Sequence, residues 1–274
     1  MVAPIVHPEY EALKREVANL RDEVAHAIEG LNHLREAKPV LLALYRQKIG
    51  ELELQCLEAK CRAEWFRRYV EQVRSMQAKT LPMDTAAIED QLNTEMAGFW
   101  QKLQDMADEN AKAQDVLSHL VPPEKVHAIR DLFRRIVKRL HPDVNPEVGD
   151  REHLLLRRAQ EAYERSDLDE LEAIADSLAG LSPEQAMPDA QTAVQQERDR
   201  LQKVFAGLLD KIEKLEAQSP YNLKDKLKDE AWIAEERVRL EKELKAWSQK
   251  VRLFEDQLKE LLGDGYAQIR FGQN

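Results

Sequence analysis

The chain has few of the residues that build compact catalytic domains. Its 274 residues include nine glycines, two cysteines and 6% aromatic residues, against 34% charged residues. This composition is typical of long helices that pack through narrow apolar seams. The sequence contains no Gly-rich phosphate loop, nucleophile elbow or metal-spaced His/Cys cluster. We therefore expect an all-α protein that is not an enzyme and has no catalytic, cofactor-binding or metal-binding residues.

Long apolar runs are also missing. No stretch of eighteen apolar residues occurs, and Met1 to His7 lack the basic and apolar regions of a secretory signal. We expect a cytoplasmic protein that does not enter a membrane. Cys56 and Cys61 have no second pair at metal-ligand spacing, so we do not expect a zinc or redox site. Cys56 falls on the apolar seam of its helix, and we expect it to be a small buried residue. The net charge of -10 argues against a nucleic-acid partner.

Most of the chain carries apolar residues at alternating steps of three and four, as coiled coils do. The clearest seam runs from Tyr45 to Val73. Pro39 is expected to end a first helix that precedes this seam. Pro82 is expected to separate the helix that carries the seam from a third helix. Short breaks between helices favour antiparallel packing. These features predict an N-terminal coiled-coil region over residues 1–115.

Two further seams of similar length are separated by Ser219 and Pro220. They predict a C-terminal coiled-coil hairpin over residues 182–265, followed by a frayed tail at 266–274. Intramolecular bundles and dimeric coiled coils follow the same heptad pattern. The sequence therefore leaves open whether the chain forms a homo-oligomer, and which client or assembly partner the coiled coils bind.

The central segment, residues 116–181, has shorter helices and a local reversal of charge. From Lys125 to Arg139 there are six basic residues against one acid, Asp131. In an acidic chain such a helix face indicates an acidic partner, because complementary potentials steer encounter. A charged run of this kind is also typical of a solvated helix face.

The basic helix is expected to end at His141 and Pro142, since proline disfavours helical geometry in the residue before it. Asp150 can then cap a second helix that carries apolar residues up to Tyr163. We expect the two helices to pack antiparallel, with Asp143 at the tip of the hairpin beside the basic face.

The run from Ile129 to Pro146, IRDLFRRIVKRLHPDVNP, resembles the second helix and signature loop of J domains. Residues 160–164, QEAYE, resemble the third helix of that family, with Tyr163 twenty-two residues after His141. Phe133 stands at the position of the usual aromatic residue. J domains bind DnaK-type heat-shock chaperones and stimulate their ATP hydrolysis. The resemblance therefore implies a J-domain co-chaperone whose chemistry belongs to its partner.

The same resemblance implies which residues bind the chaperone. Asp143 would make the decisive charged contact, and His141 and Pro142 would shape the loop. The electrostatic face would consist of five basic residues of the preceding helix: Arg130, Arg134, Arg135, Lys138 and Arg139.

Two departures from the J-domain pattern motivate an alternative. Leu140 and Val144 stand where that family has a tyrosine and a basic residue. The alternative is a coiled-coil scaffold or assembly protein with a degenerate J-like hairpin that engages no chaperone. An enzyme that uses His141 and Asp143 as an acid–base pair is a third hypothesis, which no accompanying motif supports.

Overall fold

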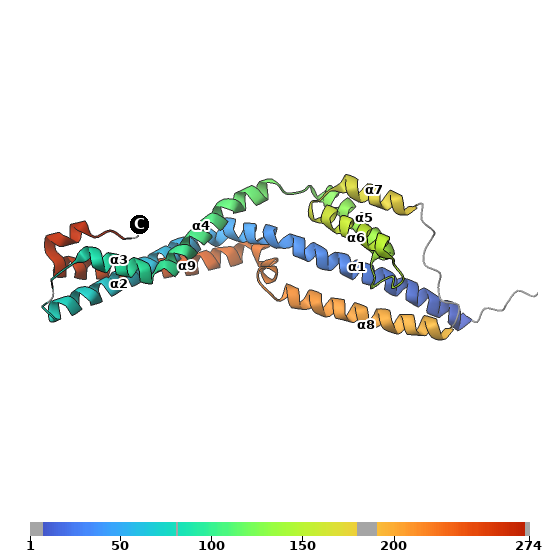
Figure 1. Cartoon of the computed structure of the whole chain (residues 1–274), viewed down its shortest axis with the longest axis horizontal. Helices are drawn as coiled ribbons and strands as arrows, with labels where there is room; N and C mark the ends of the chain where they lie inside the picture. The colour runs from blue at the N-terminus through green and yellow to red at the C-terminus, as the bar shows by residue number, and fades with distance from the viewer. Residues whose placement is uncertain (1–7, 81, 180–190, 272–274) are drawn as a thin grey trace, which may run out of the picture. The chain divides into compact units, whose positions relative to one another are not determined.

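The computed structural model describes residues 8–80, 82–179 and 191–271 (Figure 1). Every regular element in these ranges is helical and no strand occurs among them, which confirms the all-α fold class. The chain forms two compact units: unit 1 comprises Met1–Pro39 and His119–Asn222, and unit 2 comprises Val40–Ser118 and Leu223–Asn274. None of the described helices has an apolar stretch that would cross a lipid bilayer.

The described residues form a series of α-helices along the chain. Their bounds are α1 Pro8–Tyr45, α2 Glu51–Ala78, α3 Thr85–Glu95, α4 Ala97–Ser118, α5 Pro123–Leu140, α6 Asp150–Glu164, α7 Leu168–Ala179, α8 Gln191–Glu216 and α9 Glu230–Leu262. A π-helical segment, Arg46–Gly50, joins α1 to α2.

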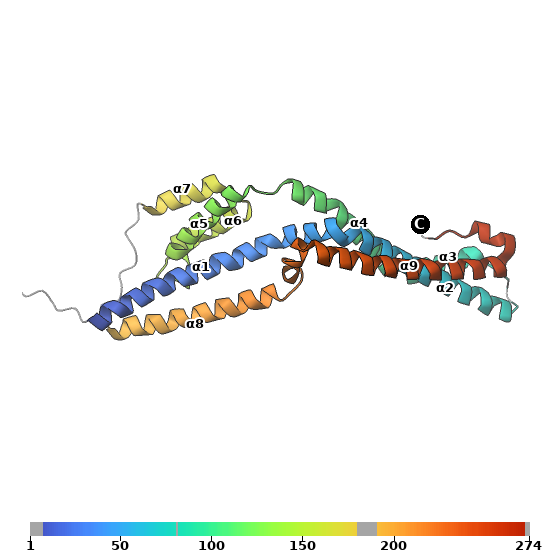
Figure 2. The ribbon, with the colours of Figure 1, turned by 180° about the vertical axis from the view of Figure 1, so that it is seen from behind.

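Unit 1 is built around the first part of α1. In both views this part lies between α8 and the group formed by α5, α6 and α7 (Figure 1 and Figure 2). Apolar side chains from all five helices share one core, and the fully buried ones include Val17, Val24, Phe133, Ile136, Ala159, Ala162, Leu171, Val194 and Leu201. Side chains of α1 and α8 are therefore part of the same apolar core as those of α5, α6 and α7.

Helices α5 and α6 form the predicted antiparallel hairpin. Pro123 occupies the first turn of α5, where its missing N–H costs no hydrogen bond. Ala159 and Ala162 of α6 are fully buried, and their small side chains allow close approach. The rings of Phe133 and Tyr163 lie 4.4 Å apart between the two helices. Gly149 is the N-cap of α6, so the prediction that Asp150 caps this helix is wrong by one position.

Unit 2 pairs α2 with α9 and with α3 and α4. Cys56 contacts Leu240 early in both helices, and Gln77 contacts Leu261 late in both, so α2 and α9 run in parallel. Both cysteines are buried and free, which confirms the predicted burial of Cys56. Helices α3 and α4 return antiparallel along α2, as the short break before them predicts. The third predicted helix is divided at Met96, which is fully buried between α3 and α4.

The prediction that Pro39 interrupts its helix is wrong. Pro39 lies inside α1, and it is exposed to solvent. Proline removes one helical hydrogen bond and frees the carbonyl four residues earlier. On an exposed side of the helix, water can satisfy that carbonyl, so the helix continues through the proline.

The expectation of a frayed tail is wrong for residues 266–271. The ring of Phe271 lies 5.0 Å from that of Trp100 and 5.6 Å from that of Trp65, within the apolar core of unit 2. Burial of aromatic surface holds this segment.

The region predicted as one hairpin over residues 182–265 contributes to both units, because α8 belongs to unit 1 and α9 to unit 2. The boundary predicted between residues 181 and 182 lies outside the described residues.

Two leucines of α8 test its packing in unit 1. Leu201 is fully buried, whereas Leu209 is 46% exposed. We expect Leu201→Ala to lower the free energy of unfolding by about 2–5 kcal/mol, because it removes a buried side chain and leaves a cavity. Leu209→Ala, the matched control, should lower it by less than about 1 kcal/mol. Urea unfolding followed by circular dichroism measures both, and equal losses would contradict the described packing.

Candidate partner-binding site

The loop between α5 and α6 is held from within by two side chains. Asn145 is buried, and its amide Nδ2 donates to the backbone oxygens of Lys138 and Arg139 at 2.9 and 2.6 Å. It thereby satisfies carbonyls at the C-terminal end of α5, which have no partner inside the helix. Val144 is fully buried beside it. Sequence reasoning missed Asn145, although an asparagine just after a helix end is a recognisable signal for such capping.

His141 and Asp143 are linked through the backbone. His141 adopts an extended conformation at the end of α5, and its Nδ1 accepts a hydrogen bond of 3.1 Å from the Asp143 N–H. Only a neutral imidazole can accept at this nitrogen. Burial lowers the pKa of His141, and the nearby Asp143 carboxylate offsets part of that decrease. The neutral imidazole thus helps to shape the turn that follows it.

The predicted tip residues remain accessible. Pro142 is exposed and Asp143 is half-buried. Among the described residues, the Asp143 carboxylate makes no hydrogen bond or ion pair. A carboxylate in this state is available to a donor on another molecule.

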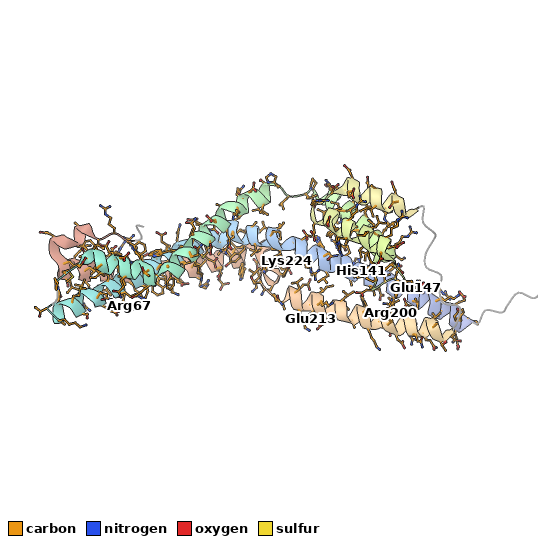
Figure 3. All side chains as sticks on the ribbon, in the orientation of Figure 1. Arg67, His141, Glu147, Arg200, Glu213 and Lys224 are labelled. Atoms are coloured by element: carbon orange, nitrogen blue, oxygen red, sulfur yellow. The ribbon has the colours of Figure 1, made fainter. Side chains whose placement is uncertain are left out.

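Helix α8 contacts the same loop from outside the hairpin. Arg200 Nη1 donates to the backbone oxygen of Asp143 at 2.8 Å, and Nη2 lies 3.5 Å from that of Val144. Figure 3 labels Arg200 on α8 and His141 on the hairpin. Fifty-seven residues separate Arg200 from Asp143, and no local pattern connects them. Sequence reasoning therefore had no signal for this contact.

Glu197 connects Arg200 to α1. Its carboxylate accepts hydrogen bonds from Arg200 at 2.8 and 3.0 Å and from Arg21 at 3.3 Å. Burial by itself would raise the pKa of Glu197, but the hydrogen bonds and charges of the two arginines outweigh it and lower the pKa. The loop, α8 and α1 are thus joined by one charged network.

The basic face of α5 lies against α1. Three of its residues, spaced four apart, meet residues of α1 in reverse order, which sets the two helices antiparallel. The pairs are Arg130 with Glu29, Arg134 with His26, and Lys138 with Asp22, at closest distances of 2.6, 3.1 and 2.7 Å. We call these three pairs the α1–α5 ladder.

Glu29 is the buried end of the ladder. It is only 1% exposed, accepts two hydrogen bonds from Arg130 and lies 3.2 Å from the Tyr163 hydroxyl. Burial, followed by the charge of Glu29, raises the pKa of Tyr163, which keeps its hydroxyl a donor. The hydrogen bonds to Glu29 also raise the pKa of Arg130. The buried charge is thus compensated from both helices of the hairpin.

The other two basic residues of the predicted face lie elsewhere. Arg139 donates to the backbone oxygen of Leu178 in α7 at 2.6 Å. Arg135 is exposed and, among the described residues, forms no hydrogen bond or ion pair, so it faces solvent. Of the five predicted basic residues, three therefore face α1, one contacts α7 and one is open.

The arrangement offers charged and backbone groups for binding. In the part of the chain that the structure describes, no group of three or more His, Cys, Asp or Glu side chains could hold a metal ion. Comparison of the chain with protein-family models, curated proteins and solved structures finds no match.

The His141–Asp143 contact predicts a titration behaviour. We expect a His141 pKa below its ordinary value of 6.5, and a still lower one in Asp143→Asn, because that change removes the charge that favours the imidazolium. Since the pKa of His141 is depressed in the folded protein, the neutral imidazole contributes to the free energy of unfolding above pH 6.5. This contribution is lost as the pH falls toward the folded pKa, because protonation of the buried imidazole favours the unfolded chain.

Imidazole NMR titration measures the shift. Glu147→Gln removes the same charge from an exposed position of the same loop and should leave the pKa of His141 nearly unchanged. A His141 pKa above 6.5 in the parent protein, or one that rises in Asp143→Asn, would contradict the described geometry.

Proposed function

We propose that the chain is a co-chaperone or adaptor that recruits a DnaK-type ATPase through the His141–Asp143 loop and stimulates its ATP hydrolysis. The observation that carries the proposal is the Asp143 carboxylate, which has no hydrogen-bond or ion-pair partner among the described residues although its backbone is held on both sides. Arg135 adds an exposed positive charge on the preceding helix. The packed seams of the remaining helices would select a client or a location.

What supports the proposal is the division of labour in the loop. Asn145 and Val144 hold the turn, while Pro142 is exposed and the half-buried Asp143 has an unpaired carboxylate among the described residues. A preorganised loop loses less conformational entropy when it binds a partner. The unpaired carboxylate can then form a charge-assisted hydrogen bond with a basic group of the ATPase. In this scheme the protein supplies contacts, and the partner supplies the chemistry of hydrolysis.

A second candidate function is assembly. The α1–α5 ladder pairs three basic residues of the hairpin within the same chain. This observation favours a scaffold in which the hairpin is a packing element and engages no chaperone. Salt-sensitive, nucleotide-dependent capture of the chaperone by the full chain would exclude it, because electrostatic contacts between two molecules weaken with ionic strength.

An ATPase assay with the DnaK-type chaperone of the same organism tests the proposal. We expect the full chain to stimulate hydrolysis, and Asp143→Asn to need a concentration about 30-fold higher or more for the same effect, since loss of one partner from a charged contact costs about 2 kcal/mol or more. His141→Gln should weaken stimulation in the same direction.

Glu147→Gln is the matched control, because it removes a carboxylate from the exposed part of the same loop. It should stimulate like the parent protein. No stimulation by the parent, or equal stimulation by the parent and Asp143→Asn, would reject the co-chaperone proposal.

A further inference from the structure

The basic face of α5 already has an acidic occupant. Arg130 and Lys138 pair with carboxylates of α1, and Arg134 contacts His26 between them. A guanidinium or ammonium group that binds one carboxylate at such short range has fewer donors left for another. An external acidic surface therefore competes with α1 for the same side chains.

The loop has an occupant as well. Arg200 of α8 binds the backbone oxygens of Asp143 and Val144, and Glu197 holds Arg200 in place. This contact leaves the Asp143 carboxylate unpaired, yet it places a helix beside the residue that a partner would have to reach. The two occupants are joined, because Glu197 also pairs with Arg21 of α1.

We propose that α1 and α8 together form a clasp over the hairpin, and that an acidic partner surface must displace them to bind the basic face and loop. This inference rests on the proposed function, since the partner in question is the DnaK-type ATPase. It specifies that the described arrangement is the closed form, and that the occupant of the basic face in this form is the chain's own α1.

The ladder also indicates where the clasp opens. Glu29 is 1% exposed, whereas the side chain of Asp22 at the other end is 60% exposed. Exposed ion pairs contribute little and are screened by salt, but a buried charge that loses its partner is costly. The end of the ladder next to the loop, at Lys138 and Asp22, therefore separates first. Glu29 keeps α1 attached while the loop end becomes accessible.

A pair of double variants tests the clasp. Asp22→Lys with Arg200→Gln disrupts the loop end of the ladder and the α8 contact without altering the hairpin. The matched control, Glu23→Lys with Lys203→Gln, makes the same change of net charge at exposed neighbouring positions. Among the described residues, neither side chain forms a hydrogen bond or ion pair. Asp22→Lys alone serves as a second test variant in case the double variant does not fold.

Two measurements are made on each full chain: amide hydrogen exchange in α1 and α8, and affinity for the ATP-bound DnaK-type chaperone. We expect faster exchange in both helices of the clasp variant and a dissociation constant about tenfold lower than that of the parent. Apparent affinity rises in proportion to the fraction of molecules in the binding-competent form. The control should match the parent in both measurements.

The outcomes separate the two proposals. If the parent and the clasp variant bind the chaperone equally well, the clasp inference is overturned and the proposed function stands. Faster exchange in the clasp variant without chaperone binding by either protein would overturn the proposed function, and the clasp inference with it. Tighter binding by the clasp variant but not by the control supports both.

Discussion

The carboxylate of Glu29 is buried where α1 meets both helices of the hairpin. Removing a charged group from water costs roughly several kcal/mol, unless hydrogen bonds and an opposite charge compensate for the lost hydration. Arg130 and Tyr163 supply that compensation from α5 and α6. Because a one-turn slip of α1 would leave Glu29 buried without partners, this contact determines the register of α1 on the hairpin. The apolar core of unit 1 supplies most of the packing free energy between α1 and the hairpin, and Glu29 determines the register of that packing.

That register decides what the charged surface can do. With Glu29 opposite Arg130, the antiparallel pairing brings Asp22 to Lys138, next to the loop. The helix that completes the core of unit 1 is therefore also the helix that covers the basic face. In the proposed clasp, stability and partner binding are coupled through α1, because the packing that holds the hairpin also covers its basic face. Arg200 of α8 extends this coupling to the loop backbone.

Local patterns in the sequence predicted the helices, the hairpin and the burial of Cys56, because periodicity and proline chemistry act over a few residues. The patterns failed where environment decides. Helix α1 continues through Pro39 because this proline is on an exposed side of the helix. At the site, the sequence singled out Asp143, His141 and the basic helix. It could not reveal the partners of that helix, since Asp22 and Glu29 lie about a hundred residues away in the chain and look like ordinary surface acids beside an apolar seam.

The most direct test of this account is a double-mutant cycle between Glu29 and Arg130. Urea unfolding of Glu29→Gln, Arg130→Met and the combined variant measures their coupling free energy. The account predicts that each single change is destabilising and that the combined change costs about 2 kcal/mol less than the sum of the two, because removing both partners leaves no unpaired buried charge. Losses that add to within about 0.5 kcal/mol would show that the two residues do not interact, and would contradict the role assigned to Glu29.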